Sequence, residues 1–159
     1  MSRSLADWLS WQQSLHPREI DLGLDRVRRV LDRLHIATPA GRVFAIAGTN
    51  GKGTTAHYLA ALMAARGWRP GVYTSPHLVR YNERIRLGDE HVADAELISA
   101  FAAVDAARQG ESLTYFEVGT LAAAWLFAHG QLDAWVLEVG LGGRLDAVNA
   151  IEPDFSLIT

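Results

Sequence analysis

The feature that most constrains this chain is the stretch FAIAGTNGKGTTAHYLAALMAARG, which runs from Phe44 to Gly67. It opens with an apolar run typical of a buried strand, passes through a glycine-rich turn, and continues with helical periodicity. Three glycines fall within the six residues GTNGKG, and their entropic cost marks a backbone shape that the fold requires. This order predicts a phosphate-binding loop, because backbone N–H groups and the helix dipole converge at a helix N-terminus.

The match to the Walker pattern G-x-x-x-x-G-K-[ST] is partial. Gly51 and Lys52 fit it, but the first glycine would fall on Ile46, and Gly53 stands where the pattern has Ser or Thr. Lys52 is the only lysine of the chain. A compact ammonium on a flexible stem can follow a moving phosphoryl oxygen better than a bulkier, fixed guanidinium fork. The alternative is an ordinary glycine-rich turn with an exposed lysine.

Short apolar runs elsewhere predict further strands. Together with the run before the glycine turn, the predicted strands are 42–47, 70–75, 133–140 and 154–159. A hairpin is expected to turn at Gly88-Asp89. Strands that alternate with helices predict a mostly parallel, doubly wound α/β sheet of the P-loop NTPase type. A chain that stops on an apolar strand is expected to be the incomplete N-terminal domain of a longer protein.

Helical periodicity accounts for most of the remaining segments. One helix is expected after a Ser4 cap and a second from about Leu24. Asp94 is expected to cap a third, and a fourth covers roughly Glu117 to His129. The second helix carries arginines at 26, 28, 29 and 33 among aspartates, a pattern that favours a solvated charged face over an anion site.

Composition excludes several classes of protein. The chain has no cysteine and a formal net charge of −3, so it has no disulfide or cysteine-based metal site and no basic footprint for nucleic acid. No run reaches the roughly 18 apolar residues that a membrane span needs. The first residues lack the apolar core of a secretory signal. A cytoplasmic protein without membrane or nucleic-acid partners is expected.

Five segments together resemble the folylpolyglutamate synthase/dihydrofolate synthase family, whose members are relatives of the Mur ligases. They stand in the family's order across nearly the whole chain. The combination of IDLGLDRV with LTYFE is most similar to the bacterial bifunctional type. As written here they are IDLGLDRV (20–27), AGTNGKGTT (47–55), YTSPHLVRYNERIR (73–86), LTYFEVGT (113–120) and LEVGLGGRLDAVN (137–149).

The resemblance implies an ATP-dependent acid–amino-acid ligase acting in folate biosynthesis and polyglutamylation. L-Glutamate would be joined to dihydropteroate, or to the γ-carboxylate of folates, through an acyl phosphate, with ATP and Mg²⁺ as cofactors. Residues 1–159 would be the N-terminal part of the Mur ligase-like ATP-binding domain. Within it, 1–40 would form a helical lead-in with a pterin-site segment and 41–159 the P-loop core, and the C-terminal domain would be absent.

The resemblance also implies roles for residues near the glycine turn. Ser75 and Glu138 would hold the metal, since hydroxyl and carboxylate oxygens suit a hard cation, and Lys52 and Glu138 would be catalytic. A glutamate that closes a buried strand needs a cation beside it, because an unpaired buried carboxylate is costly. The ATP-binding set would be Thr49, Asn50, Gly51, Lys52, Gly53 and Thr54.

A further set would bind the pterin, with an aromatic ring stacking on it and a carboxylate pairing with its amino edge. On residue type alone, Tyr115 and Phe116 are more often core residues. Val148 stands where the family usually has Thr, which leaves its role open. The implied set is Asp21, Leu22, Gly23, Leu24, Thr114, Tyr115, Phe116, Glu117, Arg144, Leu145 and Asp146.

Other functions stay open at this point: a P-loop kinase, another Mur-type amide ligase, or a nucleotide-binding fragment without catalysis. A GTPase is excluded, because its guanine-reading segment needs a second lysine. In the family, a second metal site uses a histidine and a carbamylated lysine that lie further along. The chain alone is therefore expected to bind nucleotide weakly and to lack ligase turnover, within a parent that is monomeric.

Overall fold

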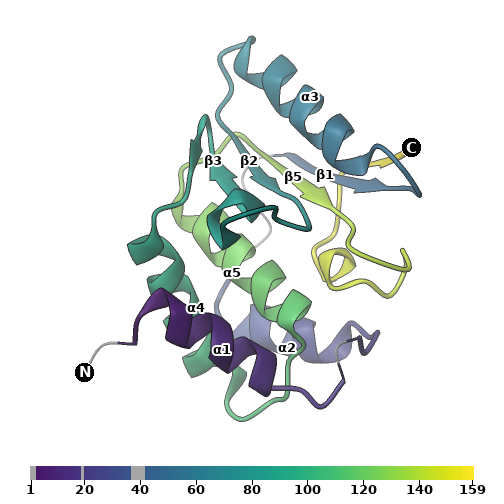
Figure 1. Cartoon of the computed structure of the whole chain (residues 1–159). Coiled ribbons are helices and arrows are strands. Elements are labelled where there is room, and N and C mark those ends of the chain that lie inside the picture. Colours follow the sequence, from purple (N-terminus) through teal and green to yellow (C-terminus); the bar gives the residue numbers. More distant parts are fainter. Residues whose placement is uncertain (1–2, 19, 37–41) are drawn as a thin grey trace.

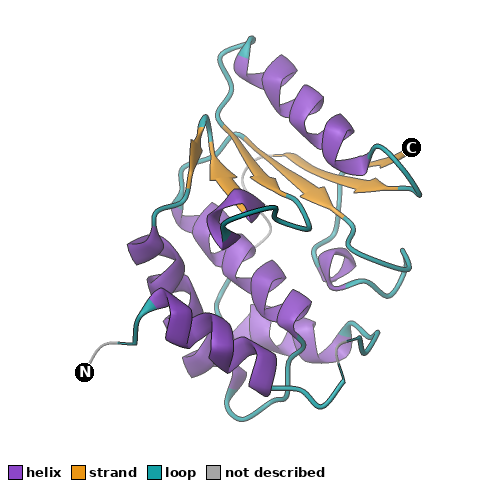
Figure 2. Cartoon of the chain, in the orientation of Figure 1, coloured by secondary structure: helices purple, strands orange, loops and turns teal. Residues whose placement is uncertain are grey.

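The computed structural model describes residues 3–18, 20–36 and 42–159. A sheet lies at its centre with helices on both sides, drawn in orange and purple in Figure 2. The helices are α1 (Leu5–Ser14), α2 (Asp25–Arg33), α3 (Lys52–Ala64), α4 (Asp94–Arg108) and α5 (Tyr115–His129), with 3₁₀ turns η1 (Tyr81–Arg84) and η2 (Ala147–Ala150). The strands are β1 (Arg42–Ala47), β2 (Pro70–Tyr73), β3 (Ile85–Leu87), β4 (Glu90–His91), β5 (Ala134–Glu138) and β6 (Phe155–Ile158).

The described strands form one sheet in the order β4-β3-β2-β5-β1-β6. Strand β5 lies parallel to both β1 and β2, and β6 lies parallel to β1. Strands β3 and β4 form the predicted hairpin and add to β2 in antiparallel fashion. The mostly parallel sheet predicted from the sequence is therefore confirmed, with an antiparallel extension at one edge.

Each central strand is apolar on both faces, as a buried parallel strand must be. Along β5, Val136 packs in a cluster with Ala56 and Ala60 of α3. Its neighbours Trp135 and Leu137 belong instead to the larger cluster on the opposite face. Figure 1 shows α3 on one side of the sheet and α1, α2, α4 and α5 on the other. This arrangement confirms the doubly wound prediction.

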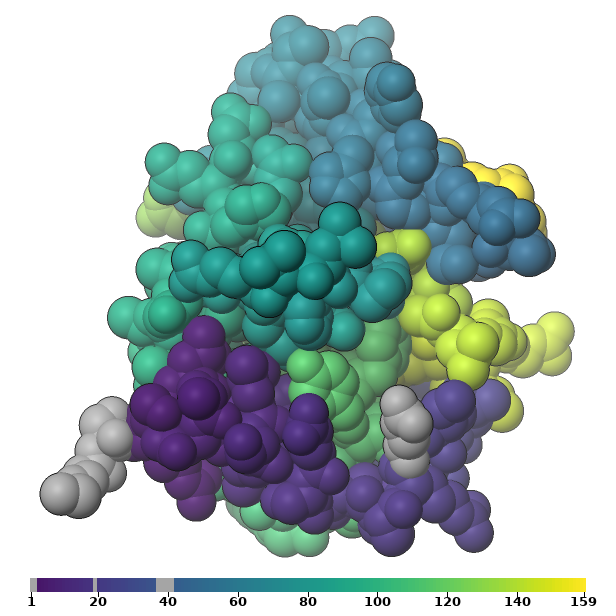
Figure 3. Space-filling view, viewed as in Figure 1, coloured from purple at the N-terminus to yellow at the C-terminus, as the bar shows by residue number. Residues whose placement is uncertain are grey.

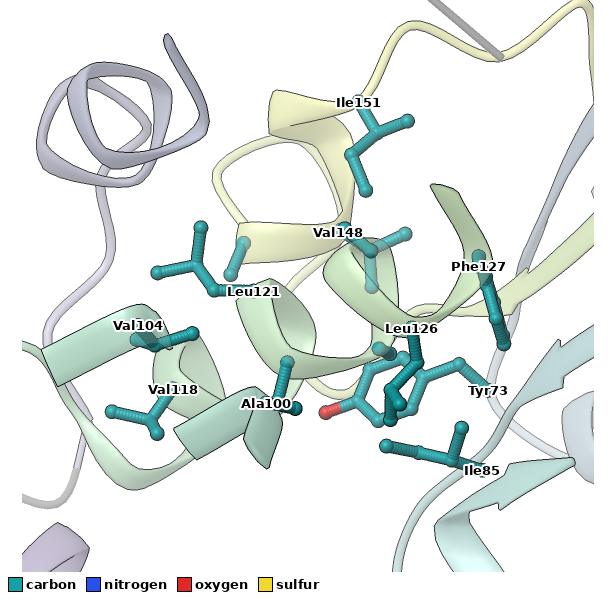
Figure 4. Packing of buried hydrophobic residues seen from close by; sticks show 14 of the residues in the cluster. Tyr73, Ile85, Ala100, Val104, Val118, Leu121, Leu126, Phe127, Val148 and Ile151 are labelled. Carbon is teal, nitrogen blue, oxygen red and sulfur yellow. The ribbon is translucent and has the colours of Figure 1, made fainter. Parts of the chain in front are cut away.

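The larger cluster joins the sheet to α5 and to the segment after β5. Figure 4 shows Tyr73 and Ile85, from adjacent strands, facing Leu126 of α5, while Val148 from η2 approaches α5 from the other end. All four of these side chains are almost completely buried. The sheet, α5 and η2 therefore form one packing unit, which fixes the loop between β5 and η2.

Two helix starts differ from the sequence prediction. Asp94 is not the cap of α4 but its first residue: the cap is Ala93, whose backbone N–H donates to Glu96 Oε2 at 2.7 Å. The Asp94 carboxylate accepts hydrogen bonds from Arg80 and Asn82 instead. Helix α5 begins at Tyr115 rather than near Glu117, with Thr114 as its N-cap. The backbone N–H of Glu117 donates to Thr114 Oγ1, and Thr114 N donates to Glu117 Oε2 at 2.7 Å. This reciprocal capping box is encoded by the T-x-x-E pattern.

Two sequence expectations need a separate comment. The proposed boundary between the lead-in and the core at residues 40 and 41 lies outside the described residues, so it stays a prediction. Over the ranges that the structure describes, none of the helices is long and apolar enough to cross a bilayer.

We predict that Gly119→Ala destabilises the protein, although alanine is normally the better helix former by about 1 kcal/mol. A Cβ at this position of α5 would lie 2.7 Å from the Tyr81 hydroxyl oxygen and 2.8 Å from that of Tyr73. Overpacking of this kind costs about 1–3 kcal/mol. Urea unfolding measures the change, and adding Tyr73→Phe and Tyr81→Phe should restore most of the loss. A more stable single variant would contradict the packing described here.

Candidate active site

The glycine turn links the end of β1 to the start of α3. Gly51 is the N-cap of α3 with a φ of 78°, and Gly48 has a φ of 142°, a region that side chains disfavour. Lys52 is the first residue of α3, and its Nζ donates to the carbonyl oxygen of Gly48 at 3.1 Å. The ammonium is thus folded back over the turn, as a phosphate-binding loop requires.

Glu138, the last residue of β5, lies directly beside this turn. Its side chain is buried, and its Oε2 accepts a hydrogen bond from the backbone N–H of Ser75 at 2.8 Å. A Cβ added to Gly53 would lie 3.7 Å from both carboxylate oxygens, so the first turn of α3 passes against the carboxylate. The structure therefore brings together the two residues predicted to bind metal.

The oxygen ligands at this point suit a hard divalent cation. Among the described residues no group of three or more His, Cys, Asp and Glu side chains could hold a metal. Mg²⁺ typically uses one or two protein oxygens and completes its shell with water and phosphate oxygens. The carboxylate of Glu138 and the hydroxyl of Ser75, next to a phosphate-binding turn, fit this pattern.

A cavity of about 790 Å³ extends from the turn toward α1 and α5. Lys52, Ser75 and Pro76 line it together with most of the residues predicted to bind the pterin. In Figure 3, on this face of the molecule, green surface near α5 lies between the purple α1 and the yellow-green segment after β5. The predicted residues that line the cavity are Asp21, Leu22, Gly23, Thr114, Tyr115, Phe116, Glu117, Leu145 and Asp146.

Two residues of that predicted set do not line the cavity. Leu24 is the N-cap of α2, and Arg144 is exposed in the loop after β5. Val148, the departure from the family pattern, is completely buried in the large apolar cluster. Its backbone N–H donates to Asp146 Oδ1 at 3.0 Å. A side-chain hydroxyl is therefore not needed at Val148 for the loop to hold this shape.

The aromatic residues of the cavity are anchored by packing. A Cβ at Gly140 would lie 2.6 Å from the Phe116 ring, so this ring packs closely against a glycine backbone. Tyr73 packs on Phe116 with ring centroids 5.9 Å apart, and Tyr81 meets Tyr115 edge-on at 5.7 Å. Both residues of the Tyr115–Phe116 pair thus belong to the core and also line the cavity, which reconciles the two interpretations of this pair.

Glu117 is buried in the cavity wall and is fully engaged. Arg26 Nε donates to both of its carboxylate oxygens, at 2.7 and 2.9 Å, and the N–H of Thr114 donates to Oε2. Arg26 Nη1 also pairs with Asp21 at 2.6 Å, which lowers the pKa of that aspartate. The pairing ties the lead-in segment to the start of α5.

The role of Arg26 was missed at the level of sequence. The arginines of α2 were interpreted as a solvated face, but Arg26 pairs with Glu117, and Arg29 and Arg33 pair with Glu111. A signal was available, since Arg26 directly precedes Val27, a completely buried residue. An arginine at the rim of a buried helical stripe is well placed to reach a capping glutamate.

Asp146 is another buried carboxylate, and it lies in the loop after β5. It accepts N–H groups from Leu141 at 2.9 Å and Val148 at 3.0 Å. Burial raises the pKa of this carboxyl, and the nearby Glu117 charge acts in the same direction. Unlike Glu117, Asp146 has no ion-pair partner among the described side chains.

His77 lies two residues after Ser75, which is predicted to bind the metal. Arg84 Nε donates to His77 Nδ1 at 2.8 Å, and burial lowers the pKa of the imidazole. Arg84 is itself buried and lines the cavity. The histidine therefore orients the segment after Ser75 by accepting a hydrogen bond from this arginine.

Fold and site together define a class: an α/β protein with a glycine-rich turn between a strand and a helix, an acidic strand end beside it, and an adjoining cavity. No family model matches the chain. It is 52% identical over 155 residues to the dihydrofolate synthase/folylpolyglutamate synthase of Escherichia coli, an alignment that covers 98% of this chain and 37% of that protein.

Solved structures agree with this relationship. The structure of E. coli FolC in complex with DHPP and ADP superimposes with a TM-score of 0.97 at 51% identity, covering 99% of this chain and 38% of that one. A bifunctional folylpolyglutamate synthase/dihydrofolate synthase with Mn, AMPPNP and L-glutamate bound gives 0.93 at 49% identity, with the same coverage. The chain belongs to the dihydrofolate synthase/folylpolyglutamate synthase family and spans about 37% of the length of the relatives that it matches.

We predict that Arg26→Met lowers the free energy of unfolding by about 3–5 kcal/mol, because it leaves the buried Glu117 carboxylate without its charge partner. Arg29→Met is the matched control on the same helix, since Arg29 is exposed and should cost much less. Adding Glu117→Gln to Arg26→Met should recover part of the loss. Equal effects of the two single variants in urea unfolding would contradict this assignment.

Proposed function

We propose that this chain supplies the phosphate-binding and acid-binding parts of an ATP-dependent ligase. The ligase joins L-glutamate to dihydropteroate and to the γ-carboxylate of folates. The observation that carries the proposal is the continuity of one cavity, which runs from Lys52 and Ser75 to the segments around Asp21, Phe116 and Asp146. An acid bound in this cavity would present its carboxylate to the phosphate end.

Ligands of the relatives support the proposal. E. coli FolC has been solved with DHPP and ADP, and a bifunctional relative with Mn, AMPPNP and L-glutamate. Their structural similarity extends over 99% of this chain. We therefore assign the same classes of ligand to this chain: an adenine nucleotide, a divalent cation, a pterin-bearing acid and glutamate.

At the phosphate end, backbone N–H groups of the turn would hold the nucleotide. The positive end of the α3 dipole adds about half a charge, and Lys52 would exchange its bond to the Gly48 carbonyl for a phosphoryl oxygen. The residues proposed for this role are Thr49, Asn50, Gly51, Lys52, Gly53 and Thr54. Ser75 and Glu138 would hold Mg²⁺, which when bound supplies charge neutralisation between phosphate oxygens.

The reaction begins when an oxygen of the acid's carboxylate attacks the γ-phosphorus of ATP. The bond from that phosphorus to the β–γ bridging oxygen breaks, and ADP leaves. The glutamate amine then attacks the acyl carbon, loses a proton, and displaces inorganic phosphate to form the amide. A free carboxylate is too poor an electrophile for this second step. The protein contributes alignment for in-line transfer and donors for the developing charge.

At the other end, the pterin would lie against Phe116 and Tyr115. Glu117 is already engaged with Arg26, so Asp146 is the carboxylate available to the amino edge of the ring. Its raised pKa reflects desolvation, and a cationic or N–H donor ligand would favour its ionised form. Asp21, Leu22, Gly23, Thr114 and Leu145 would complete the walls.

The remaining expectations fit the same scheme. We propose that the protein works in the cytoplasm, where its co-substrate ATP is abundant, and as a monomer. Leu24 and Arg144, which do not line the cavity, are proposed to act only through the loops that carry them.

We predict that Lys52→Ala weakens binding of Mg·AMPPNP to this chain by about 10- to 100-fold, the equivalent of a charge-assisted hydrogen bond. Calorimetric titration measures the affinity, and Lys52→Arg should restore only part of it, because the fork is geometrically fixed. Thermal unfolding of the apo proteins serves as the control for folding. An unchanged affinity in Lys52→Ala would exclude Lys52 from phosphate binding.

We further predict that a chimera, in which this chain replaces the matched segment of the E. coli relative, forms ADP over repeated turnovers only when dihydropteroate and glutamate are both present. Glu138→Gln in the chimera should reduce that ADP formation by at least about 100-fold, as expected when a ligand of the cation that neutralises the phosphoryl charge is lost. A coupled ADP assay provides the measurement. A soluble, folded chimera without substrate-dependent release would count against the proposed function.

A further inference from the structure

Gln12 of α1 is a polar side chain that the proposed function has not yet used. It is only 1% exposed. Among the described residues, neither its amide nitrogen nor its amide oxygen has a hydrogen-bond partner. Most buried amides in folded proteins are paired, and an unpaired one costs about 1–3 kcal/mol. A residue kept at this cost needs an explanation that packing does not provide.

The position of Gln12 points to a ligand. Gln12 lines the 790 Å³ cavity together with His16, one helical turn further along the chain, and with Tyr115 of α5. Helix α1 and the start of α3 lie on opposite sides of the sheet (Figure 1). Gln12 therefore belongs to the end of the cavity that is remote from Lys52, where no reacting group is expected.

Three other polar side chains at this end, those of His16, Asp21 and Glu117, are already paired. His16 Nε2 lies 3.3 Å from Asp21 Oδ2. The Nδ1 of the same ring is hydrogen-bonded to the carbonyl oxygen of Arg18 at 2.9 Å. Asp21 and Glu117 share Arg26. Gln13 also lines this end but is exposed to solvent. Of the buried side chains described here, Gln12 carries the carboxamide that keeps both its donor and its acceptor capacity.

We propose that Gln12 is a specificity-determining residue that recognises the heterocycle of the acid substrate. The inference rests on the proposed function. A planar carboxamide offers an acceptor and a donor side by side, which complements a lactam or aminopyrimidine edge. In the ligand-free protein the amide is closed off from solvent, and a rotation of its flexible side chain brings it to the ligand. The hydrogen bonds that the Gln12 amide does not form in the apo protein are then formed in the complex.

This role leaves a thermodynamic signature that a structural role does not. If Gln12 were retained for stability, its replacement would weaken both folding and binding. If it is retained for recognition, an apolar residue of the same length removes an unpaired buried amide. The apo protein then keeps or gains stability, while the complex loses hydrogen bonds. The two effects have opposite signs.

The test uses the full chain and two substitutions, Gln12→Met and Gln12→Leu. Dihydropteroate is titrated into each protein by calorimetry, and the apo proteins are melted in parallel. We expect the Kd for dihydropteroate to rise about tenfold in both variants, which corresponds to one or two neutral hydrogen bonds. The melting temperature should stay unchanged or rise. The Kd for Mg·AMPPNP should not change.

A second ligand separates recognition of the ring from a general disturbance of the cavity. The acid 4-(benzylamino)benzoate keeps the carboxylate end and replaces the pterin by a phenyl ring. Wild type and variants should bind it with equal affinity. Equal dihydropteroate affinity in wild type and both variants, or a parallel loss for both acids, would overturn the role of Gln12 and leave the proposed function standing. Failure of the wild type to bind dihydropteroate would instead overturn the proposed function and this inference together.

Discussion

The parallel pairing of β5 with both β1 and β2 is the constraint on which the rest of the site depends. Ile46 of β1 stands opposite Glu138 of β5, and Tyr73 of β2 stands opposite Leu137. The carboxyl ends of these three strands therefore lie side by side. The glycine turn follows β1, Glu138 ends β5, and Ser75 follows β2. Ligands of open α/β sheets bind at this kind of edge. No single loop could bring these groups together, whereas a parallel sheet does so through its register.

The half of the cavity that we propose binds the acid depends on a different interaction, the buried ion pair of Arg26 and Glu117. Glu117 caps the start of α5 and would be costly to bury alone. Arg26 compensates for it and also holds Asp21, so the lead-in segment is attached to α5 by charge as well as by apolar packing. Because Glu117 is already paired with Arg26, we propose Asp146 and Gln12 as the groups that form hydrogen bonds with a ligand.

Much of this could be predicted from local patterns. The strand–turn–helix at Phe44–Gly67, the hairpin at Gly88-Asp89 and the mostly parallel sheet all depend on periodicity and turn chemistry within short segments, and all are confirmed. Family motifs pointed to Ser75 and Glu138, and the structure places them together. The start of α5 was misplaced even though the T-x-x-E capping box is visible in the sequence.

Long-range pairings could not be predicted in the same way. Arg26 and Glu117 are 91 residues apart, and nothing in either segment names its partner. The unpaired state of Gln12 is likewise a property of packing, since the same residue on an exposed helical face would be unremarkable. Val148 was left open because a missing hydroxyl has meaning only once its surroundings are known, and these are apolar.

The central claim is that the glycine turn, Ser75 and Glu138 form one site for a nucleotide phosphate chain and its cation. Backbone amide NMR of the chain during a titration with Mg·AMPPNP tests it most directly. We predict saturable shifts at Asn50 to Thr54 and at Ser75, with much smaller shifts when magnesium is omitted. Saturable shifts confined to other parts of the chain, with the turn and Ser75 unchanged, would contradict the account.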